Sequence, residues 1–529
     1  MTMKIEISNE MHEGSFCEIL NAALRQFSEK PCLSFGDRQF SYADVDQASA
    51  KVANSLREAG FAVGMKAAIY SLNSDQAFIV TLGIVRAGGI WMPVNPRNSE
   101  ADNIDCLSQL GCDALFYQGR FAAAADTLRQ SCSEMKAFVK LDDDLNGAPP
   151  NLSCWTASAS TLVPELWVSG SDLLSIPTTG GTTGRPKGVM LSHRNFCAID
   201  FATRTSYLKH GSVMLCAAPM THAAGRLAMT SLSSGVHLVV LDKVDPQLIL
   251  SSIQDQGITD LFLPPTSIYA LLDQPNLKDF NLSSLRCLSY GSAPMSIERL
   301  REALLKLGPV MRGGYGQTEC PTFITALLQE DHFVDGEIAP DSRLRSVGRS
   351  TCISKLTILD EFGRELPCGE RGEIAVKGGN VCEGYYNNVQ ETADIRFNGW
   401  HLTGDIGYLD GDGFLFIVDR KKDMIISGGF NVYSVEVEQA LMTLPGVREA
   451  VVFGVPSKKW GEEVKALILP KADFDLDPAT LISACKQLLG SVKTPKSIEI
   501  VDAFPTTAIG KVDKKRLRKN YWGLQVNQI

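Results

Sequence analysis

Apolar positions in the first part of the chain alternate between a helical spacing and short runs typical of strands. The clearest helical segment follows Ser41, which has Asp44 three residues on as a weak capping box, and it ends before Gly60. Its apolar stripe repeats every three or four residues and comprises Val45, Ala48, Val52 and Leu56. The pattern predicts a helix here and a second one over residues 75–86.

Short apolar runs at 66–70, 235–241 and 261–264 predict buried strands between such helices. This alternation predicts α/β layers with largely parallel sheets. The most apolar stretch, residues 77–85, ends at Arg86 and is too short to cross a bilayer. We therefore expect no integral membrane segment.

The pattern becomes strand-like after residue 346, with apolar runs at 355–359, 373–377 and 414–418. The Asp-Gly-Asp-Gly sequence at 410–413 has no later carboxylate at calcium-loop spacing, so we interpret it as a hairpin turn. This part of the chain predicts a small β-region.

A charged run at 419–423 precedes about a hundred residues, which is enough for a small α+β domain. The predicted fold class is therefore α/β, with a large body of α/β subdomains and a β-region over residues 1–418. A small α+β domain is expected over 423–529.

Composition and charge exclude several classes of protein. The chain has 529 residues, 44% of them hydrophobic and 21% charged, as in ordinary soluble globular proteins rather than disordered, collagen-like or coiled-coil ones. A net charge of −9 argues against a nucleic-acid partner. Residues 420–529 carry 17 Lys and Arg against 12 Asp and Glu, a net of +5, so the remainder carries −14.

The 14 cysteines are scattered and form no Cys-x-x-Cys pair, and Cys106 and Cys112 are the closest two. We interpret them as small buried hydrophobic residues in a reducing compartment. The polar N-terminus and a C-terminus without a targeting signal add to the expectation of a cytoplasmic protein.

The segment Thr-Thr-Gly-Gly-Thr-Thr-Gly-Arg-Pro-Lys-Gly at 178–188 is the first candidate for chemistry. Its glycines let backbone N–H groups approach an anion, its threonines add hydroxyl donors, and Lys187 adds a positive charge. It is not a Walker A loop, because no Gly-Lys-Ser/Thr is present. Composition alone suits an anion-binding loop and an ordinary polar turn equally.

The order of these residues resembles the signature loop of adenylate-forming enzymes: acyl-CoA synthetases, luciferases and adenylation domains of peptide synthetases. Nearly the whole chain is similar to that family, with further motifs in the family's order at 87–96, 219–225, 291–294, 315–319, 372–373, 384–386, 403–405, 419–423 and 505–511. The resemblance implies an AMP-forming carboxylate–CoA ligase. ATP, Mg²⁺ and coenzyme A are the implied cofactors and substrates, with a small-molecule carboxylic acid.

In this chemistry the carboxylate attacks the α-phosphate of ATP, giving an acyl-adenylate and pyrophosphate. Because negative charge builds up on the phosphate oxygens, the site must supply positive charge and hydrogen-bond donors. The resemblance implies that the nucleotide is bound by Thr179, Gly180, Gly181, Thr182, Thr183, Gly184, Lys187, Gly291, Ser292, Ala293, Pro294, Gly314, Tyr315, Gly316, Gln317, Thr318, Asp405, Arg420 and Lys511. Within this set Tyr315 would stack on adenine and Thr318 would bond the α-phosphate. Glu319 would hold Mg²⁺.

The resemblance assigns Asp405 to the ribose hydroxyls, with Arg420 as an assisting donor. It assigns Lys511 to the carboxylate and α-phosphate during adenylation, so Lys511, Thr318, Glu319 and His222 form the implied catalytic set. By residue type alone, Asp405 fits a turn cap and Lys511 fits a solvated basic tail equally well.

The implied acyl pocket contains His222, Gly225, Gly313 and Gly316. We expect His222 to position the acid rather than act as a base, because a carboxylate nucleophile needs no deprotonation. Relatives restricted to acetate or propionate carry Trp where this chain has Gly316. The pocket is therefore expected to admit a medium- or long-chain fatty acid, or an aromatic or alicyclic acid.

For the second half-reaction the resemblance implies a hinge at 419–422 and a mobile C-terminal domain that rotates about Lys422. Rotation would withdraw Lys511 and bring Ser427, Gly428 and Gly429 to line the CoA tunnel. The chain departs from the family at Ser434, where Pro is usual, and at Gly180, where Ser is common.

Two other functions stay open from the sequence: a ligase that loads a carrier protein, and a nucleotide-binding protein without activity. Residues 221–226 contain no Asp to bind an α-amino group, and little chain follows Lys511, so we do not expect a peptide-synthetase module. The oligomeric state is open between a monomer and a homodimer.

Overall fold

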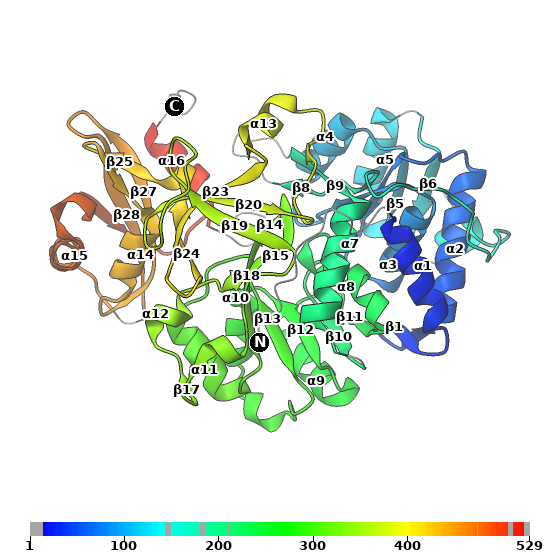
Figure 1. The fold of residues 1–529 in the computed structure, drawn as a ribbon, viewed down its shortest axis with the longest axis horizontal. Helices are drawn as coiled ribbons and strands as arrows, with labels where there is room; N and C mark the ends of the chain where they lie inside the picture. Colours follow the sequence, from blue (N-terminus) through cyan, green and yellow to red (C-terminus); the bar gives the residue numbers. More distant parts are fainter. Residues whose placement is uncertain are drawn as a thin grey trace. The chain divides into compact units, whose positions relative to one another are not determined.

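The computed structural model describes residues 14–132, 134–142, 150–179, 187–209, 211–472, 474–505 and 512–522. Packing divides the chain into two compact units. The first unit comprises Met1–Leu356 and Val376–His401, and the second comprises Thr357–Ala375 and Leu402–Ile529. Figure 1 traces the helices and strands of both units along the sequence.

A nine-stranded sheet forms one layer of the first unit. Its strands lie in the order β18 (Arg349–Ser350), β15 (Cys320–Leu327), β14 (Met311–Gln317), β13 (Cys287–Tyr290), β12 (Asp260–Leu263), β10 (Val213–Cys216), β11 (His237–Val240), β1 (Pro31–Phe35) and β2 (Arg38–Ser41). All neighbours from β14 to β1 are parallel, and the edge pairs are antiparallel. The predicted parallel α/β arrangement is confirmed.

A second, eight-stranded sheet also belongs to the first unit. Its strands are β21 (Gly384–Tyr385), β9 (Lys187–Ser192), β7 (Leu173–Ser175), β4 (Ile90–Val94), β3 (Lys66–Tyr70), β5 (Ala114–Tyr117) and β6 (Ala137–Lys140), with β8 (Thr178–Thr179) paired to β9. The pairs from β7 through β4, β3 and β5 to β6 are parallel. β4 is buried throughout, as expected for a strand covered on both faces.

Helices separate the strands along the first unit (Figure 1). They are α1 (Phe16–Gln26), α2 (Tyr42–Glu58), α3 (Asp75–Arg86), α4 (Glu100–Leu110), α5 (Ala122–Ser131), α6 (Leu152–Trp155), α7 (His193–Ala202), α8 (Ala223–Ser231), α9 (Pro246–Gln256), α10 (Pro265–Leu272), α11 (Ile297–Leu307), α12 (Asp341–Leu344) and α13 (Val389–Asp394). A π-helical turn, Thr203–Tyr207, continues α7.

The helix predicted after Ser41 is α2, and its start is a complete capping box. The Ser41 hydroxyl accepts from the N–H of Asp44, and the Asp44 carboxylate accepts from the N–H of Ser41. Gly60, with φ of 83°, follows the helix as predicted. The helix predicted over 75–86 is α3, which is buried along almost its whole length.

The predicted β-region is a five-stranded sheet in the order β19 (Ser354–Leu359), β20 (Gly372–Gly378), β23 (Trp400–Leu409) and β22 (Arg396–Phe397), with β24 (Leu415–Arg420) beside β23. The division between the two units passes along β20 and β23. The turn at 410–413 joins β23 to β24, and the Asp410 carboxylate accepts from the N–H of Asp412 and of Phe414. The predicted hairpin turn is confirmed.

The C-terminal part of the second unit is a small α+β fold, as predicted. Its sheet has the order β26 (Phe430–Val432), β25 (Ile425–Ser427), β28 (Gly461–Pro470) and β27 (Val447–Ser457), with β29 (Ser497–Ile500) beside β28. Its helices are α14 (Ser434–Met442), α15 (Pro478–Lys493) and α16 (Lys514–Trp522). Val437 and Cys485 from two of these helices pack with Ile425, Val452 and Ala466 of the sheet in one apolar core. The hinge at 419–422 stays a prediction.

All 14 cysteines are free thiols, and most of them are buried. Among the described residues, no helix combines the length and the apolar character that crossing a membrane requires.

Candidate active site

The carboxyl ends of β13 and β14 bring two predicted nucleotide-binding motifs together. Tyr290 is in register with Gly313 in this parallel pair. A Cβ atom on Gly291 would lie 2.7 Å from the carbonyl oxygen of Gly314, so only glycine allows the two chains to approach so closely. Ligand sites in open α/β sheets lie at such strand ends.

The residue after Gly291 adopts an unusual backbone conformation. Ser292 has φ of 68°, in the left-handed region that residues with a side chain rarely occupy. Such strain persists where the surrounding structure requires it, and it is common at functional sites. Ser292 and Pro294 are exposed and Ala293 is half-buried, so this predicted adenine wall is open to a ligand.

The β14–β15 hairpin presents the predicted nucleotide and magnesium motif. Tyr315 is 8% exposed, and Gln317 pairs with Cys320 across the turn that contains Thr318 and Glu319. All three turn residues from Gln317 to Glu319 are half-buried. The hairpin thus holds a hydroxyl and a carboxylate side by side next to the glycines of β14.

Glycines of β14 also make room for an aromatic residue of β15. A Cβ atom on Gly314 would lie 1.9 Å from the ring of Phe323, which stacks on Tyr207 with ring centroids 4.7 Å apart. A Cβ atom on Gly313 would lie 2.8 Å from the hydroxyl of Tyr290, and one on Gly316 would lie 3.3 Å from backbone atoms of β15. Gly316 is exposed and Gly313 is buried, so of these predicted pocket residues Gly316 faces open space.

Glu319 is held by a tyrosine from a distant part of the chain. The Tyr385 hydroxyl donates to Glu319 Oε1 at 2.8 Å. Burial, and then the neighbouring Glu319 charge, raise the pKa of Tyr385, which therefore stays a neutral donor. This bond fixes one of the two Glu319 oxygens.

A single carboxylate suits magnesium, which is usually held by one or two carboxylates together with phosphate oxygens and water. Among the described residues, no cluster of three or more His, Cys, Asp or Glu side chains is arranged to hold a metal ion. As a single carboxylate, Glu319 fits a magnesium ion that takes most of its other ligands from a nucleotide and from water.

The two ends of the predicted phosphate loop meet in one ladder. Thr178 pairs with Gly188 and Thr179 with Lys187, so β8 and β9 form the base of a hairpin. The predicted binding residues Gly180, Gly181, Thr182, Thr183 and Gly184 lie outside the described residues.

Lys187 contacts the same tyrosine as Glu319. Its ammonium group is 2.7 Å from Glu391 Oε1 and 5.0 Å from the centroid of the Tyr385 ring. The structure therefore brings together the lysine and the glutamate that the sequence assigned to phosphates and magnesium, with Tyr385 contacting both.

His222 occupies the N-cap position of α8 and is half-buried. A Cβ atom on Gly225 would lie 1.9 Å from the carbonyl oxygen of Met220, so Gly225 allows the loop to pack against the first turn of the helix. The close approach to Met220 is a packing reason for glycine at position 225. The acyl-pocket role of Gly225 stays a prediction.

Asp405 and Arg420 lie opposite each other in the second unit. They are paired in the β23–β24 ladder, with Arg420 Nε 3.6 Å from Asp405 Oδ1. The neighbouring Lys421 forms an ion pair with Glu373 at 2.8 Å. Lys422, the predicted hinge, has a lowered pKa, because burial disfavours its charge and Arg420 repels it.

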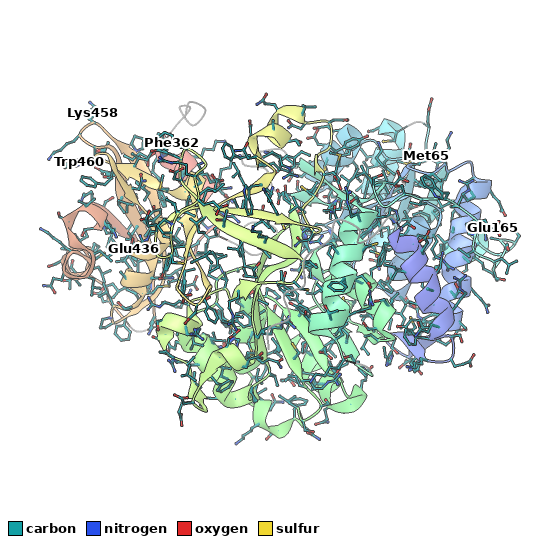
Figure 2. All side chains as sticks on the ribbon, in the orientation of Figure 1. Met65, Glu165, Phe362, Glu436, Lys458 and Trp460 are labelled. Atoms are coloured by element: carbon teal, nitrogen blue, oxygen red, sulfur yellow. The ribbon has the colours of Figure 1, made fainter. Side chains whose placement is uncertain are left out.

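The predicted CoA-tunnel residues form the tight turn between β25 and β26. Gly428 and Gly429 have φ of 60° and 83°, which favours glycine at both positions. Gly428 donates its N–H to the carbonyl oxygen of Trp460 at 2.8 Å. Lys458 and Trp460 lie in the turn between β27 and β28 (Figure 2). Ser427, the first residue of the motif, is buried.

Lys511, the predicted adenylation lysine, lies outside the described residues. The sequence motifs do not predict two residues that interact with Glu319. Tyr385 falls within a motif, but nothing in the sequence joins it to Glu319, 66 positions away. Arg226 is buried, and the Glu319 charge acts on it; its isolated charge in an apolar helical segment is the signal that could have identified it.

A model of the AMP-binding enzyme family matches residues 20–386. The chain belongs to this family. The C-terminal domain of AMP-binding enzymes matches residues 436–511, within the second unit. The resemblance seen in the sequence motifs is confirmed.

The chain is 33% identical to the medium/long-chain-fatty-acid–CoA ligase FadD8 of Mycobacterium tuberculosis, with 97% of this chain and 90% of that protein covered. It is 32% identical to a feruloyl-CoA synthase of an Amycolatopsis species, covering 92% and 95%. The crystal structure of ATP-bound MatB from Rhodopseudomonas palustris matches with a TM-score of 0.86 at 29% identity, covering 97% of this chain and all of that one. The AMP-binding fold is therefore shared along nearly the full length.

Proposed function

We propose that this protein is an ATP-dependent acyl-CoA synthetase. It activates a medium- or long-chain fatty acid, or an aromatic or alicyclic acid, to an acyl-adenylate and transfers the acyl group to coenzyme A. The observation that carries the proposal is the contact of one tyrosine, Tyr385, with both Lys187 and Glu319. A nucleotide with its magnesium ion needs a cation and a carboxylate close together, and the shared contact with Tyr385 supports that role for Lys187 and Glu319.

In the first step the acid's carboxylate forms a bond to the α-phosphorus, and the bond from phosphorus to pyrophosphate breaks. Lys187 leaves Glu391 to pair with phosphate oxygens, and Thr318 donates to the α-phosphate. Glu319 would hold the magnesium ion, which would neutralise charge on the leaving pyrophosphate. His222 keeps the acid in line and excludes water, and Lys511 pairs with the reacting oxygens.

Asp405 binds the two ribose hydroxyls, with Arg420 beside it as a donor. In the second step the C-terminal domain turns about Lys422, and the turn Ser427–Gly429 admits pantetheine. The thiol of CoA then attacks the acyl carbon, and AMP leaves. Relatives named fatty-acid–CoA ligase and feruloyl-CoA synthase support acids of this size, since both their names specify large acyl groups.

The test is a panel of carboxylic acids with ATP and Mg²⁺, with and without CoA. AMP release and thioester mass are followed together. We expect AMP and an acyl-CoA from at least one acid of eight or more carbons, or from one with a ring. Pyrophosphate exchange without any CoA thioester would instead identify a ligase that loads a carrier protein.

The Lys511→Ala variant tests whether the protein is an enzyme or a nucleotide-binding protein without activity. We expect it to lose pyrophosphate exchange while still binding ATP, because the lysine acts on the reacting oxygens. Lys515→Ala is the matched control, since Lys515 is an exposed lysine in the same basic segment. Adenylation that survives in Lys511→Ala would remove that residue from the mechanism.

A further inference from the structure

Helix α8 carries one charged side chain, Arg226, within an otherwise apolar segment. Arg226 is 5% exposed, and its helix neighbours Leu227, Ala228 and Met229 are buried as well. A charged group removed from water in this way is costly unless it is paired.

Arg226 has no such pair in the described part of the chain. Its Nε atom lacks a hydrogen-bond partner, and no ion pair joins its guanidinium group to any carboxylate that the structure describes. The two other buried arginines have partners for their guanidinium groups. Arg86 bonds to Asp46 at 2.5 Å. The Nε of Arg312 also lacks a partner, but its Nη1 donates to the carbonyl oxygen of Ser206, and the guanidinium lies 3.6 Å from the ring centroid of Tyr207. An arginine that is buried and left unpaired indicates a binding site for an anion.

The position of Arg226 tells which anion. It follows His222, the N-cap residue of α8, by four residues, so Arg226 lies in the first turns of the helix that His222 begins. Burial lowers the pKa of the Arg226 guanidinium to about 10, and the Glu319 carboxylate opposes that shift. Arg226 is therefore charged at neutral pH and is within electrostatic reach of the predicted magnesium ligand. The surroundings of Glu319 are where the carboxylate of the acid would react, so Arg226 is closer to the reacting end of the acid than to the far end of its chain.

We propose that Arg226 binds the carboxylate of the acid that is to be adenylated. The inference rests on the proposed function. The planar guanidinium matches a carboxylate with two parallel hydrogen bonds, which fixes the nucleophile without removing a proton. Arg226 thus orients the attacking oxygen, while His222 limits the space around it.

Steady-state kinetics of Arg226→Met and Arg226→Lys test this assignment with octanoate and 3-phenylpropanoate. We expect the KM for both acids to rise about 10- to 100-fold in Arg226→Met, the range for a hydrogen bond to a charged group, and less in Arg226→Lys. The KM for ATP should change less than about twofold. Met229→Leu, on the same buried helix, is the control for packing.

Guanidine added at millimolar concentration should lower the raised acid KM of Arg226→Met part of the way toward the wild-type value. It should leave the acid KM of Met229→Leu unchanged. Suberate distinguishes the alternatives. Equal losses for octanoate and suberate support binding of the reacting carboxylate, whereas a loss confined to suberate would show that Arg226 recognises a second acidic group. Unchanged acid KM values, or equal changes for acid and ATP, would overturn the proposal.

A binding measurement keeps this test separate from the proposed function. Octanoate should raise the Tm of the wild-type protein without ATP, and it should raise the Tm of Arg226→Met much less. This result requires no turnover, so it stands even if no acid yields AMP. An equal rise in both proteins would contradict the assignment of Arg226.

Discussion

At the scale of single residues, the candidate magnesium ligand depends on a hydroxyl from a different strand. Tyr385 of β21 donates to Glu319, which follows β14, and the same ring lies beside Lys187. Because a carboxylate without its donor can rotate, the position of Glu319 relative to the nucleotide depends on this bond. The tyrosine is a positioning residue, since it touches Glu319 rather than the substrate.

Tyr385→Phe is therefore expected to raise the magnesium concentration needed for half-maximal activity. The loss of one hydrogen bond to a charged group corresponds to roughly 10- to 100-fold. The measurement is AMP release against magnesium concentration at saturating ATP and acid. Tyr386→Phe is the control, because the Tyr386 hydroxyl bonds to Lys66 instead of Glu319. Equal magnesium curves for the two variants would remove Tyr385 from the site.

A second residue of the motif, Gln317, is held by a buried histidine. Arg396 donates to His401 Nδ1 at 2.7 Å, so His401 carries its proton on Nε2, which lies 3.3 Å from Gln317 Oε1. Burial, and then the Arg396 charge, lower the pKa of His401 to about 3. The folded protein therefore keeps this imidazole neutral.

This arrangement predicts loss of stability in mild acid. The unfolded chain binds a proton at His401 below about pH 6.5 and the folded chain does not, so stability is present above that pH and falls toward the folded pKa. Between pH 6.5 and 5 the loss is about 2 kcal/mol. Urea unfolding followed by tryptophan fluorescence should show a smaller pH dependence in His401→Gln. His237→Gln is the comparison at a half-buried histidine with a milder shift. An unchanged pH dependence in His401→Gln would refute the prediction.

At the scale of elements, one buried cluster joins the start of α14 to Asp419, the first residue of the predicted hinge. Ser434 donates its N–H and its hydroxyl to the carboxylate of Asp419, at the end of β24. Lys514 of α16 donates to the Ser434 hydroxyl at 2.7 Å and forms an ion pair with Glu438 at 2.7 Å. Burial raises the pKa of both Asp419 and Glu438, so each depends on its donors to stay ionised.

Ser434 is one of the two departures from the family pattern, and the cluster explains why it is tolerated. Ser434→Pro would remove the N–H and the hydroxyl together and leave Asp419 short of donors. We expect a loss of about 1–3 kcal/mol for the buried carboxylate, and about half of that for Ser434→Ala, which keeps the N–H. The loss of stability in each variant is measured by thermal unfolding of the full chain and by the rate of limited proteolysis within residues 419–529. Ser491→Ala, at an exposed serine, should have no effect, and a Pro variant as stable as wild type would contradict this account.

Local patterns predicted elements better than they predicted contacts between elements. The spacing of apolar residues and the signals at Ser41 and Gly60 located α2, and the segments of α3 and β3 have the predicted bounds. Periodicity reports which face of an element is buried, but not which strand lies beside it. The pairing of β21 with β9, which brings Tyr385 near Lys187, therefore could not be predicted from the sequence.

At the scale of the whole molecule, the motifs identify the family, which length and composition alone do not. The two family models match residues 20–386 and 436–511. The segment between them contains α13 and the strands and turns around the predicted hinge. The net charge of −9 combines −14 before residue 420 with +5 from there on. The basic part contains the two predicted CoA-tunnel glycines and Lys511, which suits an approach by the anionic phosphates of CoA.

The last prediction concerns the predicted hinge itself. The carbonyl oxygen of Lys422 accepts from Arg518 of α16 at 3.0 Å, and Arg518 also pairs with Asp423. Lys422→Pro keeps that carbonyl but fixes φ near −65°, so rotation about the residue should stop. If the domain must turn between the half-reactions, pyrophosphate exchange should stay within about threefold of wild type while thioester formation falls at least about 100-fold. Lys421→Ala, which loses the ion pair with Glu373 but not the backbone rotation, is the matched control. A Lys422→Pro variant that forms the thioester normally would place the hinge elsewhere, and one that loses both half-reactions equally would indicate a folding defect rather than a blocked rotation.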